Sequence, residues 1–248
     1  MKQGILEVST TKVYPIGKRI ALDERVFRYA YAGQALRASW GAQGWMCYSD
    51  AANVEDATIA AAGVVGDNTI LCTAVGTVTE NMYEGGYALV RWEMSYYRII
   101  SNTAATPGNT FTITVEGPLW ENINAASLVT LYRNPWADTR LLEGAGMHPL
   151  WASTVGIPRR DVALGDYYWC QTWGPCSGVL VADLGDLAAE RGLYFLANGA
   201  LYTQTGEHAT NNYPANQYAG FLLPYTGPGP AGRIQPGGLC FFMLQLSP

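Results

Sequence analysis

Charged residues are scarce in this chain, and the scarcity limits the partners that it can bind. Only 14% of the 248 residues are Asp, Glu, Lys or Arg, and the net charge is −5, whereas about a quarter of the residues in typical domains are charged. The longest basic stretches are the pairs Lys18-Arg19 and Arg159-Arg160. Nucleic-acid binding needs a basic face that neutralises phosphates, so we expect no nucleic-acid partner. So little charge indicates either burial of surface in an assembly or a polar but uncharged exterior.

The sequence motifs of common catalytic and metal sites are also missing. The only two histidines, His148 and His208, are isolated and form neither an H-x-H nor an H-x-x-x-H pair, which a zinc site would use. There is no C-x-x-C pair and no G-x-S-x-G nucleophile elbow. The Gly-rich run at 227–232 lacks the Lys-Ser/Thr of a phosphate-binding loop. These absences predict a protein without a metal or cofactor that is not an enzyme.

Carboxylates leave one enzymatic alternative open, because a glycosidase needs only two acidic side chains. Chance alone produces some close pairs among 20 acidic residues. Four tryptophans could stack on sugar rings, although tryptophan at a strand position is more often part of the core. Non-catalytic glycan binding by an aromatic patch is therefore favoured over glycan cleavage. The acidic pairs are Glu80 with Glu84, Asp161 with Asp166, and Asp183 with Asp186, and the tryptophans are Trp92, Trp120, Trp169 and Trp173.

Long apolar runs are absent as well. No stretch reaches the roughly 18 continuous apolar residues that span a bilayer, and the N-terminal sequence lacks the apolar core of a signal peptide. We therefore expect no membrane partner and folding in a cytosol. There the five cysteines would be reduced and mostly buried; a disulfide between Cys170 and Cys176, across a bend at Gly174-Pro175, is the alternative.

Alternating apolar and polar residues between residues 84 and 135 are the clearest structural signal. In Phe111-Thr112-Ile113-Thr114-Val115 every second side chain is apolar, which is typical of a half-buried β-strand. Residues 96–100 and 128–132 have the same character, and Thr106-Pro107-Gly108-Asn109 has the composition of a turn. The pattern predicts three antiparallel strands that follow one another as a meander, ended by Asn134-Pro135.

The rest of the chain also reads as short strands separated by turns. We expect an all-β fold with short antiparallel strands in one or two small barrel or sandwich modules. The predicted divisions are an N-terminal arm and hairpin (1–33), a β-meander module (34–140) and a C-terminal β module (141–248). The arm covers residues 1–16, extended and held by its own domain or by a neighbouring subunit. The hairpin turns at Asp23-Glu24; a helix is the alternative there, since Ala, Leu, Glu and Arg are good helix formers, but the alternation of Phe27, Tyr29 and Tyr31 favours strands. In the C-terminal module, which opens at 154–158, we expect strands at 167–176, 178–183, 193–197, 201–205, 221–225 and 239–246, a turn at Gly174-Pro175, a hairpin at Asn198-Gly199 and a short helical turn at 184–191.

Several packing and turn segments together resemble one kind of protein. They are Tyr14-Pro15-Ile16-Gly17; Arg25-Val26-Phe27-Arg28-Tyr29-Ala30 followed by Ala32-Gly33; Glu84-Gly85-Gly86-Tyr87; Tyr97-Arg98-Ile99-Ile100-Ser101-Asn102-Thr103-Ala104-Ala105; Val129-Thr130-Leu131-Tyr132 followed by Asn134-Pro135; and Tyr168-Trp169 followed by Gln171-Thr172-Trp173-Gly174-Pro175. These segments resemble structural proteins of tailed bacteriophages, of the kind encoded near the major capsid protein.

This resemblance implies a virion protein without catalytic residues, most simply a capsid decoration (cement) protein that binds and stabilises the outer shell. Its partners would be the major capsid protein and further copies of itself, as a homotrimer, on the capsid surface after synthesis in the bacterial cytoplasm. The alternative is a head fibre, tail or other virion surface protein that binds glycans or the host. The residues predicted to contact the capsid or a neighbouring subunit are Val13, Tyr14, Pro15, Ile16, Arg25, Phe27 and Tyr29.

Overall fold

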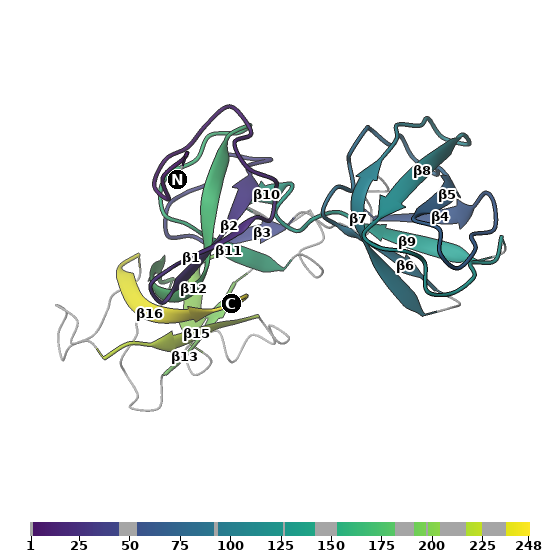
Figure 1. Cartoon of the computed structure of the whole chain (residues 1–248). Coiled ribbons are helices and arrows are strands. Elements are labelled where there is room, and N and C mark those ends of the chain that lie inside the picture. The colour runs from purple at the N-terminus through teal and green to yellow at the C-terminus, as the bar shows by residue number, and fades with distance from the viewer. Residues whose placement is uncertain are drawn as a thin grey trace. The chain divides into compact units, whose positions relative to one another are not determined.

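The all-β prediction is confirmed by a computed structural model of the chain (Figure 1). The structure describes residues 2–44, 54–91, 94–125, 127–141, 153–181, 191–196, 198–203, 217–224 and 237–248. Within these ranges the regular elements are strands and no helix is present. The helical turn expected at 184–191 lies, apart from Arg191, outside them.

The chain forms two compact units, and the second is inserted into the first. The first unit contains residues 1–45 and 136–248, and the second contains residues 46–135. This division differs from the three segments expected from the sequence. Residues 1–33 are not separate, because strand β2 (Arg25–Tyr31) pairs with β12 (Tyr167–Val179) along most of its length. An N-terminal hairpin therefore shares a sheet with the C-terminal module.

The second unit is a closed antiparallel barrel of six strands in the order β4-β5-β8-β7-β6-β9 (Figure 1). Its core contains the inward residues of every strand; on β8 these are Phe111, Ile113 and Val115, each at most 1% exposed, as the alternation predicts. The strands are β4 (Val54–Ile59), β5 (Thr69–Thr73), β6 (Tyr87–Val90), β7 (Ser95–Asn102), β8 (Thr110–Val115) and β9 (Leu128–Tyr132).

The predicted meander is correct for two strands and wrong for the third. Strands β7 and β8 pair through the expected turn, in which the Asn109 amide donates to the Thr106 carbonyl at 3.0 Å and Gly108 has φ +81°. Strand β9 pairs instead with β4 on one side and β6 on the other. Every strand of a closed barrel has two neighbours. Strand β9 closes the ring by pairing with both β4 and β6.

The first unit is a ten-stranded sheet with the path β10-β3-β11-β12-β16-β15-β13-β14, to which the β1–β2 hairpin adds through β12. The hairpin turns at Asp23, which has φ +54°, as expected for a turn residue. The pairing of β13 with β14 through Asn198-Gly199 is also confirmed. The remaining bounds are β1 (Arg19–Leu22), β3 (Ala42–Gly44), β10 (Thr139–Arg140), β11 (Thr154–Pro158), β13 (Gly192–Phe195), β14 (Leu201–Thr203), β15 (Tyr218–Leu222) and β16 (Leu239–Gln245).

Strand β12 continues through the position where a turn was expected. It pairs with β2 up to Trp173 and with β16 from Trp173 onward. A bulge lies between Gln171 and Trp173, and Gly174 has φ +90°. The Gln171 side-chain amide donates to the carbonyls of Trp173 (3.1 Å) and Pro175 (2.9 Å). The bulge and the left-handed glycine therefore redirect the strand without ending it.

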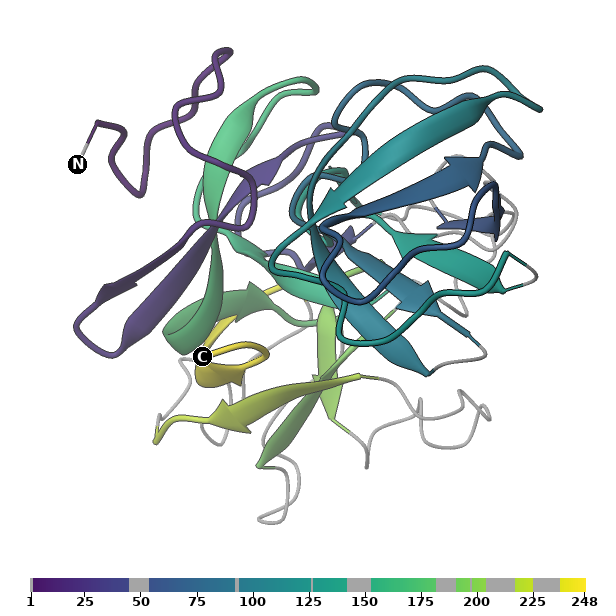
Figure 2. The ribbon, with the colours of Figure 1, turned by 45° about the vertical axis from the view of Figure 1, so that its right-hand side comes forward.

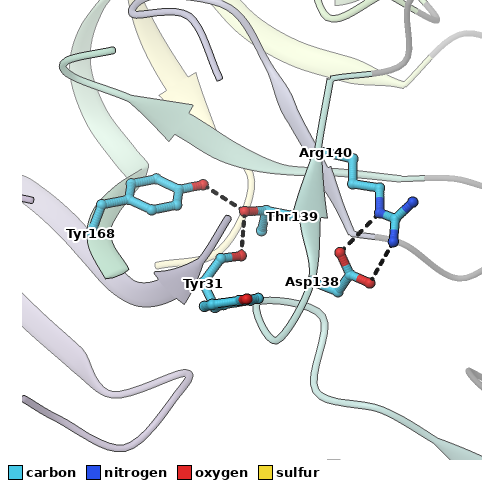
Figure 3. Close-up of polar contacts among 5 residues, drawn as sticks. All are labelled: Tyr31, Asp138, Thr139, Arg140 and Tyr168. Carbon is cyan, nitrogen blue, oxygen red and sulfur yellow. Dashed lines mark hydrogen bonds and ion pairs between the residues drawn. The ribbon is translucent and has the colours of Figure 1, made fainter. Parts of the chain in front are cut away.

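Strand β10 is anchored where the chain returns from the barrel (Figure 3). The buried Thr139 hydroxyl donates to the Tyr31 carbonyl at 2.8 Å and lies 3.0 Å from the Tyr168 hydroxyl. Beside it, Asp138 forms two hydrogen bonds with Arg140, at 2.9 and 3.0 Å. Thr139 thus ties β10 to β2 and β12, and burial raises the pKa of Tyr168 well above its usual range.

Candidate binding surfaces

Most of the residues predicted to contact another subunit pack inside the first unit. Tyr14 contacts the rings of Tyr29 and Trp169 at centroid distances of 5.4 and 5.2 Å, and Tyr29 lies 5.0 Å from Trp169. We call this group the N-terminal aromatic cluster. Its buried members are Phe27, Tyr29 and Trp169, and its half-buried members are Ile5, Val13, Tyr14, Ile16, Ile20, Leu22 and Tyr167.

Hydrogen bonds fix the N-terminal segment, the dark purple trace that leads into β1 in Figure 2, to this cluster. The Tyr29 hydroxyl donates to Gln3 Oε1 at 2.7 Å and accepts from the Val13 amide at 3.1 Å, and burial raises the pKa of Tyr29. The Trp169 indole N–H donates to the Gln3 carbonyl at 3.1 Å. The sequence predicts that the arm is held by its own domain or by a neighbouring subunit, and in the structure the arm is bound to its own domain.

Pro15 and Arg25 lie at the margin of the cluster. The Pro15 carbonyl accepts a hydrogen bond from the Lys18 amide at 3.1 Å, which closes a turn before β1. The Arg25 guanidinium is 40% exposed and lies 3.8 Å from Asp23. Contact of these seven residues with a capsid or a second copy stays a prediction.

The acidic pairs considered for glycoside hydrolysis show no shared site among the described residues. Asp161 accepts a hydrogen bond from the Ala38 amide at 2.8 Å. Glu80 is exposed and Glu84 is half-buried, and Asp183 and Asp186 lie outside the described residues. A hollow of about 310 Å³ in the first unit has Arg191, Leu222, Leu223 and Pro224 as its described lining residues, and of the described carboxylates neither Asp161 nor Asp166 is among them.

The described cysteines, Cys72, Cys170, Cys176 and Cys240, are buried thiols, as expected. The alternative disulfide between Cys170 and Cys176 is not formed. Burial raises the pKa of Cys170 and of Cys240 to about 12 and that of Cys176 to about 11. These thiols are therefore protonated and unreactive near neutral pH. Cys47, His148 and His208 lie outside the described residues, and within those residues no group of three or more His, Cys, Asp or Glu side chains could hold a metal ion.

An uncharged and mostly apolar surface lies on the outer side of the sheet in the first unit. Along β16 the residues Cys240, Phe242 and Leu244 point into the core, so the alternate residues point outward. Leu239 is 59% exposed and Phe241 is 50% exposed. We call this surface the outer β12–β16 face. It consists of Trp173, Pro175, Ser177 and Val179 on β12, Leu239, Phe241, Met243 and Gln245 on β16, and Phe221 on β15.

Cross-strand register makes this face continuous. Met243 lies between Pro175 and Phe221, and Phe241 lies opposite Ser177. None of the residues on the face carries a charge. Contiguous exposed apolar surface of this kind marks interaction sites. The sequence analysis did not predict this face. The apolar composition of Leu239–Gln245 is equally typical of a strand buried on both sides. The absence of charged residues along 173–179 and 239–245 was the available signal.

The barrel has a second candidate surface, formed by aromatic side chains. Trp120 is 62% exposed and its ring lies 5.1 Å from that of Tyr97 and 6.5 Å from that of Tyr96. Of the other tryptophans considered for sugar stacking, Trp169 is buried in the N-terminal aromatic cluster and Trp173 is half-buried on the outer β12–β16 face. Trp92 lies outside the described residues. The structure thus narrows the predicted aromatic patch to Trp120 and its neighbours.

Comparisons with known protein families, curated proteins and solved structures found no significant match to this chain. Within the described ranges, no helical segment has the length and apolar character needed to cross a membrane.

Proposed function

We propose that this protein is a structural component of a bacteriophage virion, a decoration protein that binds the outer surface of the capsid and stabilises it. The resemblance of its packing segments to virion proteins supports the class. The outer β12–β16 face supports the mode of action, because a free protein gains little from exposing Leu239, Phe241 and Phe221 together. This face is the observation on which the attachment proposal rests.

In this proposal the outer β12–β16 face lies against the major capsid protein. An uncharged sheet face binds by removing apolar area from water, at about 25 cal/mol per Å². Many copies on one shell would raise the stability of the particle even if each contact were weak. The protein would be found on the virion surface and would act without catalysis.

The N-terminal aromatic cluster would support this role indirectly. Its contacts hold β2 against β12, and β12 contributes Trp173 to Val179 to the outer β12–β16 face. Homotrimer formation is part of the proposal, because a closed oligomer multiplies the number of attachment faces.

The test is decoration of particles by a face variant. Purified full-length protein is added to phage particles that lack it, and bound protein is measured after sedimentation. We expect Phe241→Asp to reduce occupancy at least tenfold, because a buried carboxylate without a partner opposes binding. Leu164→Asp is the matched control, since Leu164 is 67% exposed in the first unit away from this face. Full occupancy with Phe241→Asp would exclude the outer β12–β16 face as the attachment surface.

Light scattering on the same variants shows whether the outer β12–β16 face binds the capsid or a second copy of the protein. If Phe241→Asp converts an oligomer to a monomer in solution, the face joins copies of the protein and the capsid attachment lies elsewhere. Truncating the N-terminal segment is a poorer test, because it removes Gln3 and Val13 from the buried Tyr29 hydroxyl.

A further inference from the structure

The outer surface of the barrel carries a small aromatic platform that the capsid attachment does not use. It consists of Trp120 and Tyr96, each 62% exposed, with ring planes at 89° to each other. Beneath them Tyr97 is 3% exposed, and its ring supports Trp120 at 5.1 Å. A fixed indole with an open face lies next to a second ring that meets it at a right angle.

Charged and apolar side chains both lie in the neighbourhood of the platform. Arg98 and Glu116 form an ion pair at 3.2 Å, and both side chains are more than half exposed. Arg98 lies two residues from Tyr96 along β7, on the same outward face. The exposed residues Val64 and Val65 lie in a loop tied to the Trp120 loop by the Val65 amide, which donates to the Asn122 side chain at 2.9 Å.

From this arrangement we propose that the platform binds a carbohydrate through a pyranose ring. One face of a pyranose presents C–H groups that pack on an indole, while its edge presents hydroxyls that need donors and acceptors. Trp120 and the valines match the first requirement. The Arg98–Glu116 pair matches the second, because guanidinium has five N–H donors and a carboxylate accepts from several hydroxyls.

The size of the platform favours a sugar over a protein. Stable protein interfaces bury on the order of 1,200 Å² or more in total, and a few rings with one ion pair provide far less. Protein hot spots also sit inside a ring of contacts that exclude water, whereas the Arg98–Glu116 pair is open to solvent.

The test uses the full-length chain on an array of immobilised oligosaccharides built from glucose, galactose, mannose, rhamnose and N-acetylhexosamines. The strongest ligand is then titrated by calorimetry. We expect Trp120→Ala to weaken binding at least tenfold and Tyr96→Ala to weaken it measurably. Val75→Ser, at another exposed apolar position of the barrel, is the matched control. Thermal melts followed by circular dichroism establish that the variants fold.

Three outcomes would overturn the carbohydrate site. They are no array signal above background, an affinity unchanged by both Trp120→Ala and Tyr96→Ala, and a Trp120→Ala variant that loses decoration of particles while the native chain binds no sugar. The last would make the platform a protein contact. Phe241→Asp should leave sugar binding unchanged, so failure of this site is distinguishable from failure of the capsid attachment.

Discussion

Cys170, Cys176 and Cys240 are buried thiols whose pKa values are raised chiefly by burial, which disfavours the thiolate. The Arg159 guanidinium, 3.1 Å from the Cys176 sulfur, partly offsets the effect there. Such side chains act as small apolar groups in the core. Their protonation nevertheless couples the stability of the first unit to alkaline pH.

We expect the free energy of unfolding to fall as pH rises above about 8.5. Unfolded thiols lose their protons near that pH, whereas the folded thiols keep theirs up to about pH 11 or 12. The unfolded state then binds fewer protons, so each thiol lowers stability by at most ~1.4 kcal/mol per pH unit. Urea unfolding between pH 7 and 10.5, followed by circular dichroism, measures this slope.

Cys240→Ala should reduce the alkaline decrease in the free energy of unfolding per pH unit by the contribution of one thiol. Cys72→Ala, in the barrel, is the control, because it should not change the slope of the first unit. An unchanged slope in Cys240→Ala would contradict the assignment of the pH dependence to burial of this thiol.

The N-terminal segment forms no long strand, yet it is bound to the first unit. Ser9 bridges Tyr167 at the start of β12, and Gln3 is 3% exposed. Its side-chain oxygen and its carbonyl each accept a hydrogen bond from a buried aromatic residue. At the scale of the element, Gln3 and Ser9 together therefore hold the segment against the first unit.

Replacing Gln3 with Ala should destabilise the first unit by about 1–3 kcal/mol, because the Tyr29 hydroxyl loses an acceptor in a buried place. The urea midpoint of the full-length chain reports the change. Leu6→Ala, at an exposed position of the same segment, should shift it by less than about 0.5 kcal/mol. Equal shifts for the two variants would mean that the segment is not held through Gln3.

At the scale of the whole molecule, the barrel is an insertion between neighbouring strands. The chain leaves the first unit after β3 and re-enters it before β10. Gly44 on β3 and Thr139 on β10 are paired directly across these two strands. The two ends of the insertion are thus already close together in the first unit. This arrangement allows each unit to fold around its own core.

We predict that replacing residues 46–135 with a short Gly-Ser linker leaves the first unit folded, and that residues 46–135 alone form the barrel. Circular dichroism and the dispersion of amide resonances in NMR spectra of the two proteins provide the check. As a control, removing the β1–β2 hairpin should unfold the first unit, because it exposes β12 and the N-terminal aromatic cluster. A disordered product from the linker replacement would show that the units depend on each other.

The sequence predicted turns and the alternation of buried side chains correctly, because these features depend on residues that are neighbours along the chain. Asn198-Gly199 predicted its hairpin, and Phe111-Thr112-Ile113 predicted which side chains enter the core. The same reading placed the strand at 128–132 beside the wrong neighbour and expected a turn at Gly174-Pro175, where β12 continues. It did not predict that most of the residues named for capsid or subunit contact pack around Tyr29 and Trp169, and their contact with a second protein stays a prediction. It also named Trp120 as one of four candidates without separating it from the other tryptophans.

The sequence by itself determined that this protein is all-β, where most turns fall, and which side chains are available for the core, because strand periodicity and turn chemistry act over a few residues. Tertiary structure alone decided the closure of the barrel through β9, the continuation of β12 from one partner to the next, and the exposure of Phe241 and Trp120. The physical reason is that every strand presents the same backbone donors and acceptors at its edges. Long-range packing therefore selects its neighbours, and with them the apolar residues that remain in contact with water.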